Sequence, residues 1–190
     1  MKVKRLVLLV AILSLLGTVT AFADSIGQKI RVFVNGSELD SSGYLVDGKA
    51  MVPLRDLSDT IKGIVQWDDD AKKVMIYKPN VHMFLFEDGN DTPFSNVKQG
   101  KYSFFVFAQI DNLQADLSSV KISIADPNGK ETDIKEQEVT SQKDSFYFRT
   151  QYVKYDFKST GKYTVRFYMK PSKSAEYQVV SEKVIVSKQN

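Results

Sequence analysis

The sequence predicts a small α+β domain, an antiparallel sheet around one helix, followed by an all-β sandwich domain. Short apolar–polar runs, Asn-Gly and Asp-Gly turns and one proline-started helical pattern fill residues 24–79. From residue 80 onward the alternating runs become longer and the helical pattern is nearly absent. These observations predict one domain over residues 24–79 and a second over residues 80–190.

Residues 1–23 have the layout of a secretory signal peptide. Three basic residues near the start precede an apolar run at 6–16, and an A-x-A sequence ends the segment at 21–23. A retained membrane anchor is the alternative, but the apolar run is shorter than the roughly 20 residues that a span needs. We therefore predict cleavage after Ala23, an exported protein, and no transmembrane span after cleavage.

Removal of this leader changes the charge balance of the chain. The full sequence has 26 Lys and Arg against 23 Asp and Glu. Three of the basic residues and no acidic residue lie in the leader, so the mature chain has 23 of each sign. This balance argues against nucleic acid as a partner. The chain has no Cys, so burial alone must stabilise its folds. The composition indicates a secreted bacterial protein, associated with the cell envelope.

The first domain begins with short strands joined by tight turns. Asn35-Gly36 and Asp47-Gly48 are strong two-residue turn signals, because these residue types tolerate positive φ. A further hairpin turn is expected at the polar residues 69–72. The predicted strands are residues 30–34, 44–46, 49–52, 64–68 and 73–77.

The helix of this domain is predicted to begin at Pro53, because proline fits the first helical turn. Leu54, Leu57 and Ile61 form one apolar stripe that is expected to face the sheet. Gly63 is expected to end the helix. The predicted domain is therefore one short helix on a small, mostly antiparallel sheet.

Four sequence motifs in this region carry a family resemblance. They are VNG at 34–36, DGKAMVPLR at 47–55, VQWD at 65–68 and VMIY at 74–77. Together they resemble the copper amine oxidase N-terminal-like domain over about residues 28–78. The resemblance implies an α+β module of exported bacterial proteins, and it implies neither copper nor oxidase activity. The family usually has Leu-Gly at the helix end, where this chain has Ile61-Lys62 before Gly63.

Pro53, Arg55, Trp67 and Asp68 are the motif residues to which we assign structural roles. Arg55 is expected to form a buried or half-buried ion pair, with Asp68 as the candidate partner. Trp67 is expected to anchor the core. The alternative for Trp67 is an exposed indole that stacks on a sugar.

The second domain is predicted from longer alternating runs. They are residues 81–86, 101–110, 120–124, 132–139, 145–152, 163–169 and 177–186. The charged run at 132–139 suits a sheet edge, and residues 126–129 form a turn. This number and spacing of strands predict an immunoglobulin-like β-sandwich. Tyr163, two residues after Gly161, resembles the tyrosine corner of such sandwiches.

The sequence carries no recognisable catalytic, cofactor or metal site. His82 is the single histidine and the chain has no Cys, so a Cys-His pair cannot form and a zinc or copper site is not expected. Phosphate-binding and nucleophile-elbow motifs are absent. The acidic stretches 68–70 and 87–91 are interpreted as solvated turns, with a calcium site as the alternative. We predict that the protein is not an enzyme; a carboxylate pair acting on wall material is the less favoured reading.

Aromatic residues supply the candidate binding surface. Phe105 and Phe107 lie on the strand face opposite Phe104, and Tyr147 similarly opposes Phe146 and Phe148. They are covered by the first domain or by loops in one interpretation, and form an exposed patch in the other.

We predict a secreted, non-enzymatic binding or spacer protein of the cell surface, with a cell-wall glycan or another surface protein as its partner. The alternative is an accessory or assembly subunit that recognises an exported protein through Phe105, Phe107 and Tyr147.

Overall fold

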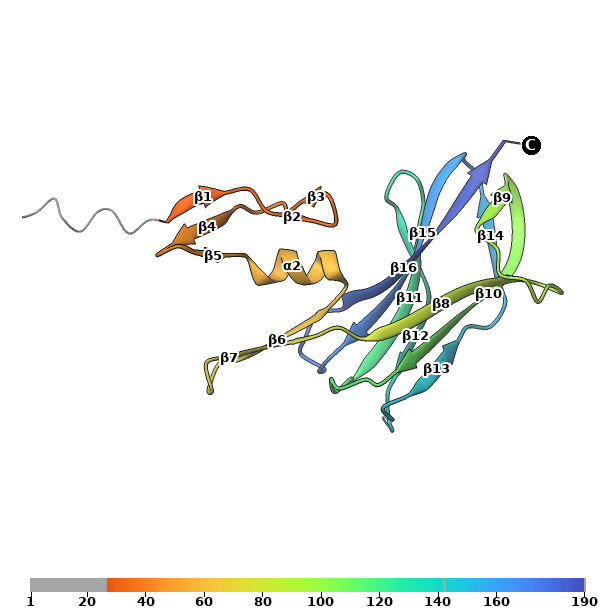
Figure 1. Cartoon of the computed structure of the whole chain (residues 1–190). Coiled ribbons are helices and arrows are strands. Elements are labelled where there is room, and N and C mark those ends of the chain that lie inside the picture. The colour runs from red at the N-terminus through yellow and green to blue at the C-terminus, as the bar shows by residue number, and fades with distance from the viewer. Residues whose placement is uncertain (1–26, 142, 190) are drawn as a thin grey trace, which may run out of the picture. The chain divides into compact units, whose positions relative to one another are not determined.

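The computed structural model describes residues 27–141 and 143–189 (Figure 1). The signal peptide predicted at residues 1–23 lies outside them. Contacts divide the chain into two compact units, one ending at Asp56 and the other beginning at Leu57. This division precedes the domain boundary predicted at 79/80, and that boundary stays a prediction. No helix within the described ranges is long and apolar enough to cross a membrane.

The first unit contains two small antiparallel sheets. One is ordered β1-β4-β5 and the other is the hairpin β2-β3. The turns at Asn35-Gly36 and Asp47-Gly48 have positive φ at all four residues, as predicted. The single strand predicted at 30–34 is instead broken into two pieces. The strands are β1 (Gln28–Ile30), β2 (Phe33–Val34), β3 (Ser37–Glu38), β4 (Gly43–Val46) and β5 (Lys49–Met51).

Helix α2 (Leu54–Ile61) follows directly after Pro53, as predicted. Its end differs from the prediction, because Lys62 rather than Gly63 takes the left-handed conformation, with φ of 57°. The Gly63 N–H then donates to the Ser58 carbonyl at 2.8 Å, which is the bond of a Schellman cap. The buried side chain of this helix is Ser58, whereas Leu54 of the predicted apolar stripe is exposed.

After the last residues of α2, the second unit continues with the hairpin β6 (Ile64–Asp68) and β7 (Lys73–Tyr77), which leads into β8 (Figure 1). Ile64 is fully buried and belongs to the core cluster of this unit. The side-chain amide of Gln178 accepts from the Val65 N–H at 2.8 Å and donates to the Val65 carbonyl at 3.1 Å. These contacts attach the hairpin to the second unit.

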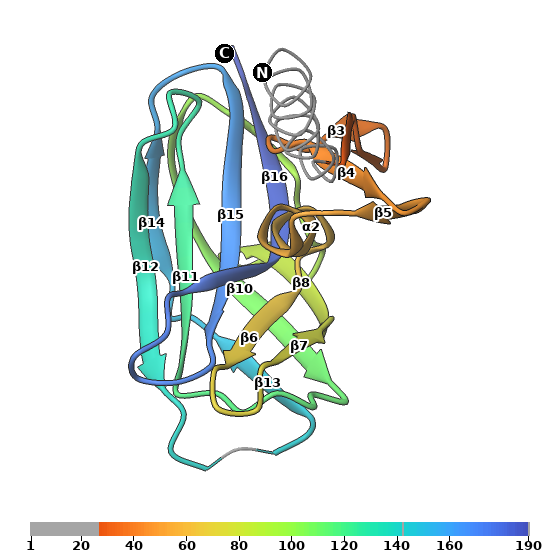
Figure 2. The same ribbon diagram turned by 90° about the vertical axis from the view of Figure 1, so that its left-hand side faces the viewer.

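Two sheets make up the rest of this unit (Figure 2). In the first sheet β10 pairs with β8 on one side and with β13 and β14 on the other. These strands are β8 (Asn80–Glu87), β10 (Gly100–Asp111), β13 (Phe146–Arg149) and β14 (Val153–Phe157). The second sheet is ordered β12-β11-β15-β16-β9, so β12 is an edge strand, as predicted. Its strands are β9 (Asn96–Lys98), β11 (Ser119–Ala125), β12 (Glu131–Glu138), β15 (Gly161–Lys170) and β16 (Gln178–Lys188).

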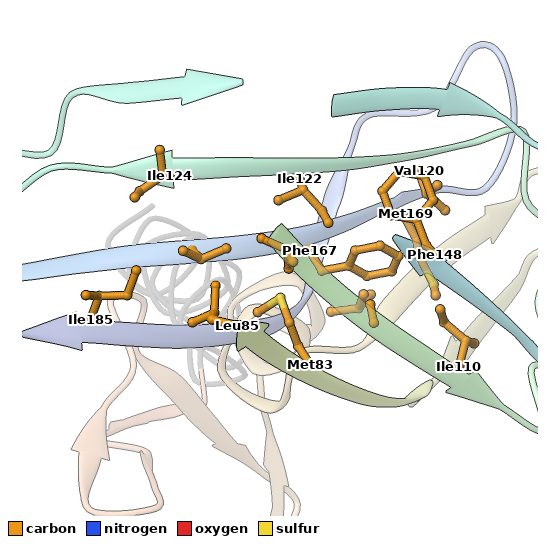
Figure 3. Packing of buried hydrophobic residues seen from close by; sticks show 14 of the residues in the cluster. Met83, Leu85, Ile110, Val120, Ile122, Ile124, Phe148, Phe167, Met169 and Ile185 are labelled. Carbon is orange, nitrogen blue, oxygen red and sulfur yellow. The ribbon is translucent and has the colours of Figure 1, made fainter. Parts of the chain in front are cut away.

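The core lies between these two sheets. Alternating side chains of β8, β10 and β15 are buried, which is the pattern that predicted these strands. Figure 3 shows Met83 and Leu85 of β8 and Ile110 of β10 on one side, with Ile122 of β11 and Phe167 of β15 on the other. Contacts across the layers include a ring pair of Phe148 with Phe167, whose centroids are 5.8 Å apart.

Tyr163 closes the turn before its own strand. Its hydroxyl accepts from the Ser159 N–H at 3.1 Å and donates to the Ser159 carbonyl at 3.2 Å. The ring itself is buried against Phe157, with centroids 4.9 Å apart. A tyrosine at this place in a sandwich therefore fixes the backbone four residues upstream.

Candidate functional site

An aromatic layer covers the outer surface of the first sheet. Because β8, β10 and β13 are neighbours, residues of one face come together in register, with Phe105 opposite Phe86 and Phe107 opposite Phe84. We call this layer the aromatic face. It consists of six rings, Phe84, Phe86, Phe105, Phe107, Tyr147 and Tyr152.

Phe105, at the centre of the aromatic face, touches rings on two sides. It stacks on Phe86 with centroids 5.2 Å apart and meets the edge of Tyr152 at 5.5 Å. Phe107 stacks on Tyr147 at 5.8 Å. Such offset and edge contacts hold the rings in fixed orientations. The aromatic face is therefore an ordered surface.

Two cations lie over this face. The Arg149 guanidinium is 3.9 Å from the Phe105 centroid and 5.6 Å from that of Tyr152. Lys183 of β16 is 5.9 Å from the Phe84 centroid. Arginine over an aromatic ring combines cation–π attraction with stacking. The aromatic face thus carries positive charge beside its rings.

The rings of the aromatic face are accessible from outside the unit. Tyr147 is 71% exposed, Tyr152 49% and Phe84 40%, and Phe105 and Phe107 are half-buried. Burial of Phe104 and Phe148 confirms the predicted alternation of these strands. The structure brings together all three predicted residues, Phe105, Phe107 and Tyr147.

Four residues of this site were missed by sequence reasoning: Phe84, Phe86, Tyr152 and Arg149. Phe84 and Phe86 alternate with the apolar Met83 and Leu85, so the run reads as apolar on both faces. The pairing of β8 with β10 was the missing fact. Once these strands are neighbours, their outward rings must lie together.

Trp67 does not anchor a core, contrary to the prediction. Its side chain is 60% exposed, and its Nε1 donates to Asp69 Oδ1 at 3.3 Å. It lines a hollow of about 580 Å³ between the β6–β7 hairpin and the loop that follows β15. Pro53 is half-buried directly before α2. The exposed indole is the alternative that the sequence analysis considered for this residue.

Arg55 is exposed rather than buried. Asp68 accepts a hydrogen bond from the Ala71 N–H at 2.9 Å and lies 3.9 Å from Lys73 Nζ. The predicted pairing of Arg55 with Asp68 stays a prediction.

The acidic turns use their oxygens for local contacts. Asp69 lies 2.8 Å from Lys72 Nζ, and the bonds from Lys72 and Trp67 lower the pKa of Asp69. Asn90 accepts from the Thr92 N–H at 2.9 Å. Across residues 27–141 and 143–189 there is no group of three or more His, Asp or Glu that could hold a metal ion. His82 is exposed on β8.

The outer surface of the second sheet has a different chemistry. Arg166 on β15 bonds Glu182 at 2.9 Å and Glu131 at 3.0 Å. Glu131 also accepts from Ser123 and Tyr168. Burial acts to raise the pKa of both glutamates, but these hydrogen bonds and positive charges outweigh it, so each pKa is lowered. The side chains of this network bond one another, whereas several rings of the aromatic face are exposed.

Residues 33–112 match the family model of the copper amine oxidase N-terminal domain. This confirms the predicted resemblance, although the match begins at β2 and continues through β8 and β10. That domain is non-catalytic in itself. The β-rich region that follows is consistent with a second β domain. No curated protein matches the chain.

Proposed function

We propose that this protein is a secreted, non-enzymatic binding protein of the bacterial cell surface that holds another exported protein through the aromatic face. The observation that carries the proposal is the ordered layer of six rings on the outside of one sheet. Large exposed aromatic patches on soluble domains mark interaction surfaces.

The composition of the face favours a protein partner. Phenylalanine, tyrosine and arginine are the residue types enriched at the centres of protein interfaces. Phe105 at its centre is covered by an arginine and by other rings. Sugar recognition needs several hydrogen-bonding side chains beside a ring. A partner with an apolar patch and a carboxylate to meet Arg149 fits this face best.

The proposed role also draws on an immunoglobulin-like type for the sandwich. We assign β8, β10 and the pair β13 and β14 to strands A, B and E of such folds, and β11, β15 and β16 to C, F and G; the strand order supports this assignment. The hydroxyl contacts of Tyr163 with Ser159 support this assignment. Domains of this type commonly act as cell-surface recognition modules.

Site-specific crosslinking tests the proposal directly. A photoreactive phenylalanine analogue is placed at Tyr147 in residues 24–190, and at the exposed Phe33 of the first unit as a matched control. After incubation with surface extract, the Tyr147 position should give one defined protein adduct that the Phe33 position lacks. Equal adducts at both positions would count against the aromatic face.

A double substitution supplies the second arm. Phe105→Ser with Phe107→Ser should abolish this adduct, because Phe107 stacks on Tyr147 and Phe105 is the central ring of the same face. Far-ultraviolet circular dichroism and a thermal melt check folding, because the inward residues Phe104 and Val106 are unchanged. An adduct of undiminished yield from the double variant would refute the proposal.

A further inference from the structure

We propose that the hollow beside Trp67 is a binding site for a neutral saccharide, with the indole stacked on the C–H face of a pyranose ring. The site is separate from the aromatic face, and the inference would hold even if that face bound nothing. The hollow lies wholly within the second unit, and its volume of about 580 Å³ falls in the range of ligand pockets.

The indole of Trp67 is exposed, and its polar edge is bonded within the chain. Tryptophan is highly buried on average, so one that is 60% exposed calls for an explanation. The Nε1–H donates to Asp69 Oδ1, which satisfies the polar edge of the ring. The apolar ring face that lines the hollow is then available for stacking.

Groups that can hydrogen-bond hydroxyls surround the ring. The polar residues that line the hollow are Gln66, Asp68, Asp69, Ser172 and Ser174. Together they offer an amide, two carboxylates and two hydroxyls, which both accept and donate. A ring face with several such groups beside it is the arrangement that a polyhydroxylated ring requires.

The charges of the hollow are already balanced, which favours an uncharged ligand. Asp69 lies 2.8 Å from Lys72 Nζ, and Asp68 lies 3.9 Å from Lys73 Nζ. A phosphate would meet two carboxylates, which excludes a nucleic acid strand as the fitting occupant. A cation would have to displace lysines that are held next to these carboxylates.

The walls of the hollow are held in place across a long stretch of sequence. The Gln178 amide bonds both backbone groups of Val65, which joins the hairpin to the start of β16. Ser172 Oγ lies 3.2 Å from Ser174 Oγ on the opposite wall. The Gln178 bonds thus attach the hairpin wall to the strand that begins just after the opposite wall, and such attachment reduces the entropy lost on binding.

Trp67 is the single tryptophan of the chain, so tryptophan fluorescence, excited selectively above the tyrosine band, reports on this site alone. The protein is titrated with cellotetraose and with chitotetraose, which are β-linked tetrasaccharides without and with N-acetyl groups. We expect a saturable blue shift and intensity change with at least one of them. A linear change, or none, with both would overturn the proposal.

Isothermal titration calorimetry of variants measures saccharide affinity and separates stacking on Trp67 from nonspecific binding. Trp67→Ala should weaken binding at least about tenfold, and Trp67→Phe should recover part of the loss. Tyr147→Ala, an exposed ring outside the hollow, is the matched control and should bind as the parent does. Unchanged affinity in Trp67→Ala would also refute the site.

The two proposals fail in distinguishable ways. The Phe105→Ser, Phe107→Ser variant should keep the fluorescence response, and Trp67→Ala should keep the protein adduct formed from position 147.

Discussion

The Nζ of Lys62 lies 3.0 Å from a carboxylate oxygen of Glu182, so the residue that ends helix α2 is fastened to strand β16. Lys62 adopts a left-handed conformation that favours glycine, and its side chain makes this contact from there. Glu182 bonds Arg166 with its other oxygen. The helix end is thereby joined to the polar network of the second sheet.

A double-mutant cycle should detect this ion pair. Lys62→Met and Glu182→Gln remove one charge each without changing the backbone conformation required at residue 62. Because both side chains are about 30% exposed, we expect a coupling of about 1 kcal/mol or less in the free energy of unfolding. Urea denaturation of the four proteins measures it, and strictly additive effects would contradict the pairing.

Acid should destabilise the protein through Glu131 and Glu182. Both have folded-state pKa values below the ordinary 4.5, so their stabilising contribution is fully present above pH 4.5. It is lost as the pH falls below that value through the folded pKa values. Denaturation midpoints between neutral and acidic pH measure the decline. The Glu131→Gln, Glu182→Gln variant should be less stable at neutral pH, and its stability should fall less steeply with acid than that of the parent. Equally steep declines in both proteins would contradict the assignment of the acid effect to these two glutamates.

Removal of the Tyr163 hydroxyl should destabilise the second unit. Tyr163→Phe leaves the Ser159 N–H and carbonyl without their partner, and we expect a loss of about 1–3 kcal/mol in the free energy of unfolding. Chemical denaturation gives the value. Tyr147→Phe, which removes an exposed hydroxyl, should change stability by less than about 0.5 kcal/mol. Equal losses of stability from the two substitutions would argue against a stabilising role for the bonds between Tyr163 and Ser159.

Loss of the Gln178 amide should free the β6–β7 hairpin while the sandwich remains folded. Gln178→Ala removes both bonds to Val65, and we expect a local cost of about 1–2 kcal/mol. Hydrogen exchange at the Val65 amide should accelerate by about tenfold, with the β10 amides unaffected. The matched control is Gln151→Ala, which removes an exposed amide and should leave the exchange at Val65 unchanged. Unaltered protection at Val65 would show that other contacts hold the hairpin.

The sequence predicts the strands of the second unit because each has one buried face and its alternation records that face. Phe104 and Phe105 are assigned to opposite sides for this reason, and the structure agrees. The sequence did not predict Phe84 and Phe86 as surface rings, because both faces of β8 carry apolar residues. Only the pairing of β8 with β10 shows that their rings complete the aromatic face.

Trp67 shows a second limit of local patterns. Whether a residue on a hairpin is covered depends on what packs against that hairpin, and here the holding contact comes from Gln178, 113 positions from Val65. Lys62 shows a third limit, since the sequence offers Gly63 as the natural end of the helix. The helix instead stops one residue earlier, where the contact with Glu182 accompanies a conformation that costs a lysine energy.

The parallel pairing of β9 with β16 sets an order on the maturation of the second unit. Asn96 pairs with Val186, so the β9 edge of the second sheet cannot form until residue 186 has been synthesised. Pairings between such distant segments slow folding, because a large loop must close first. The edge formed by β9 is therefore expected to be among the last parts of the second sheet to form.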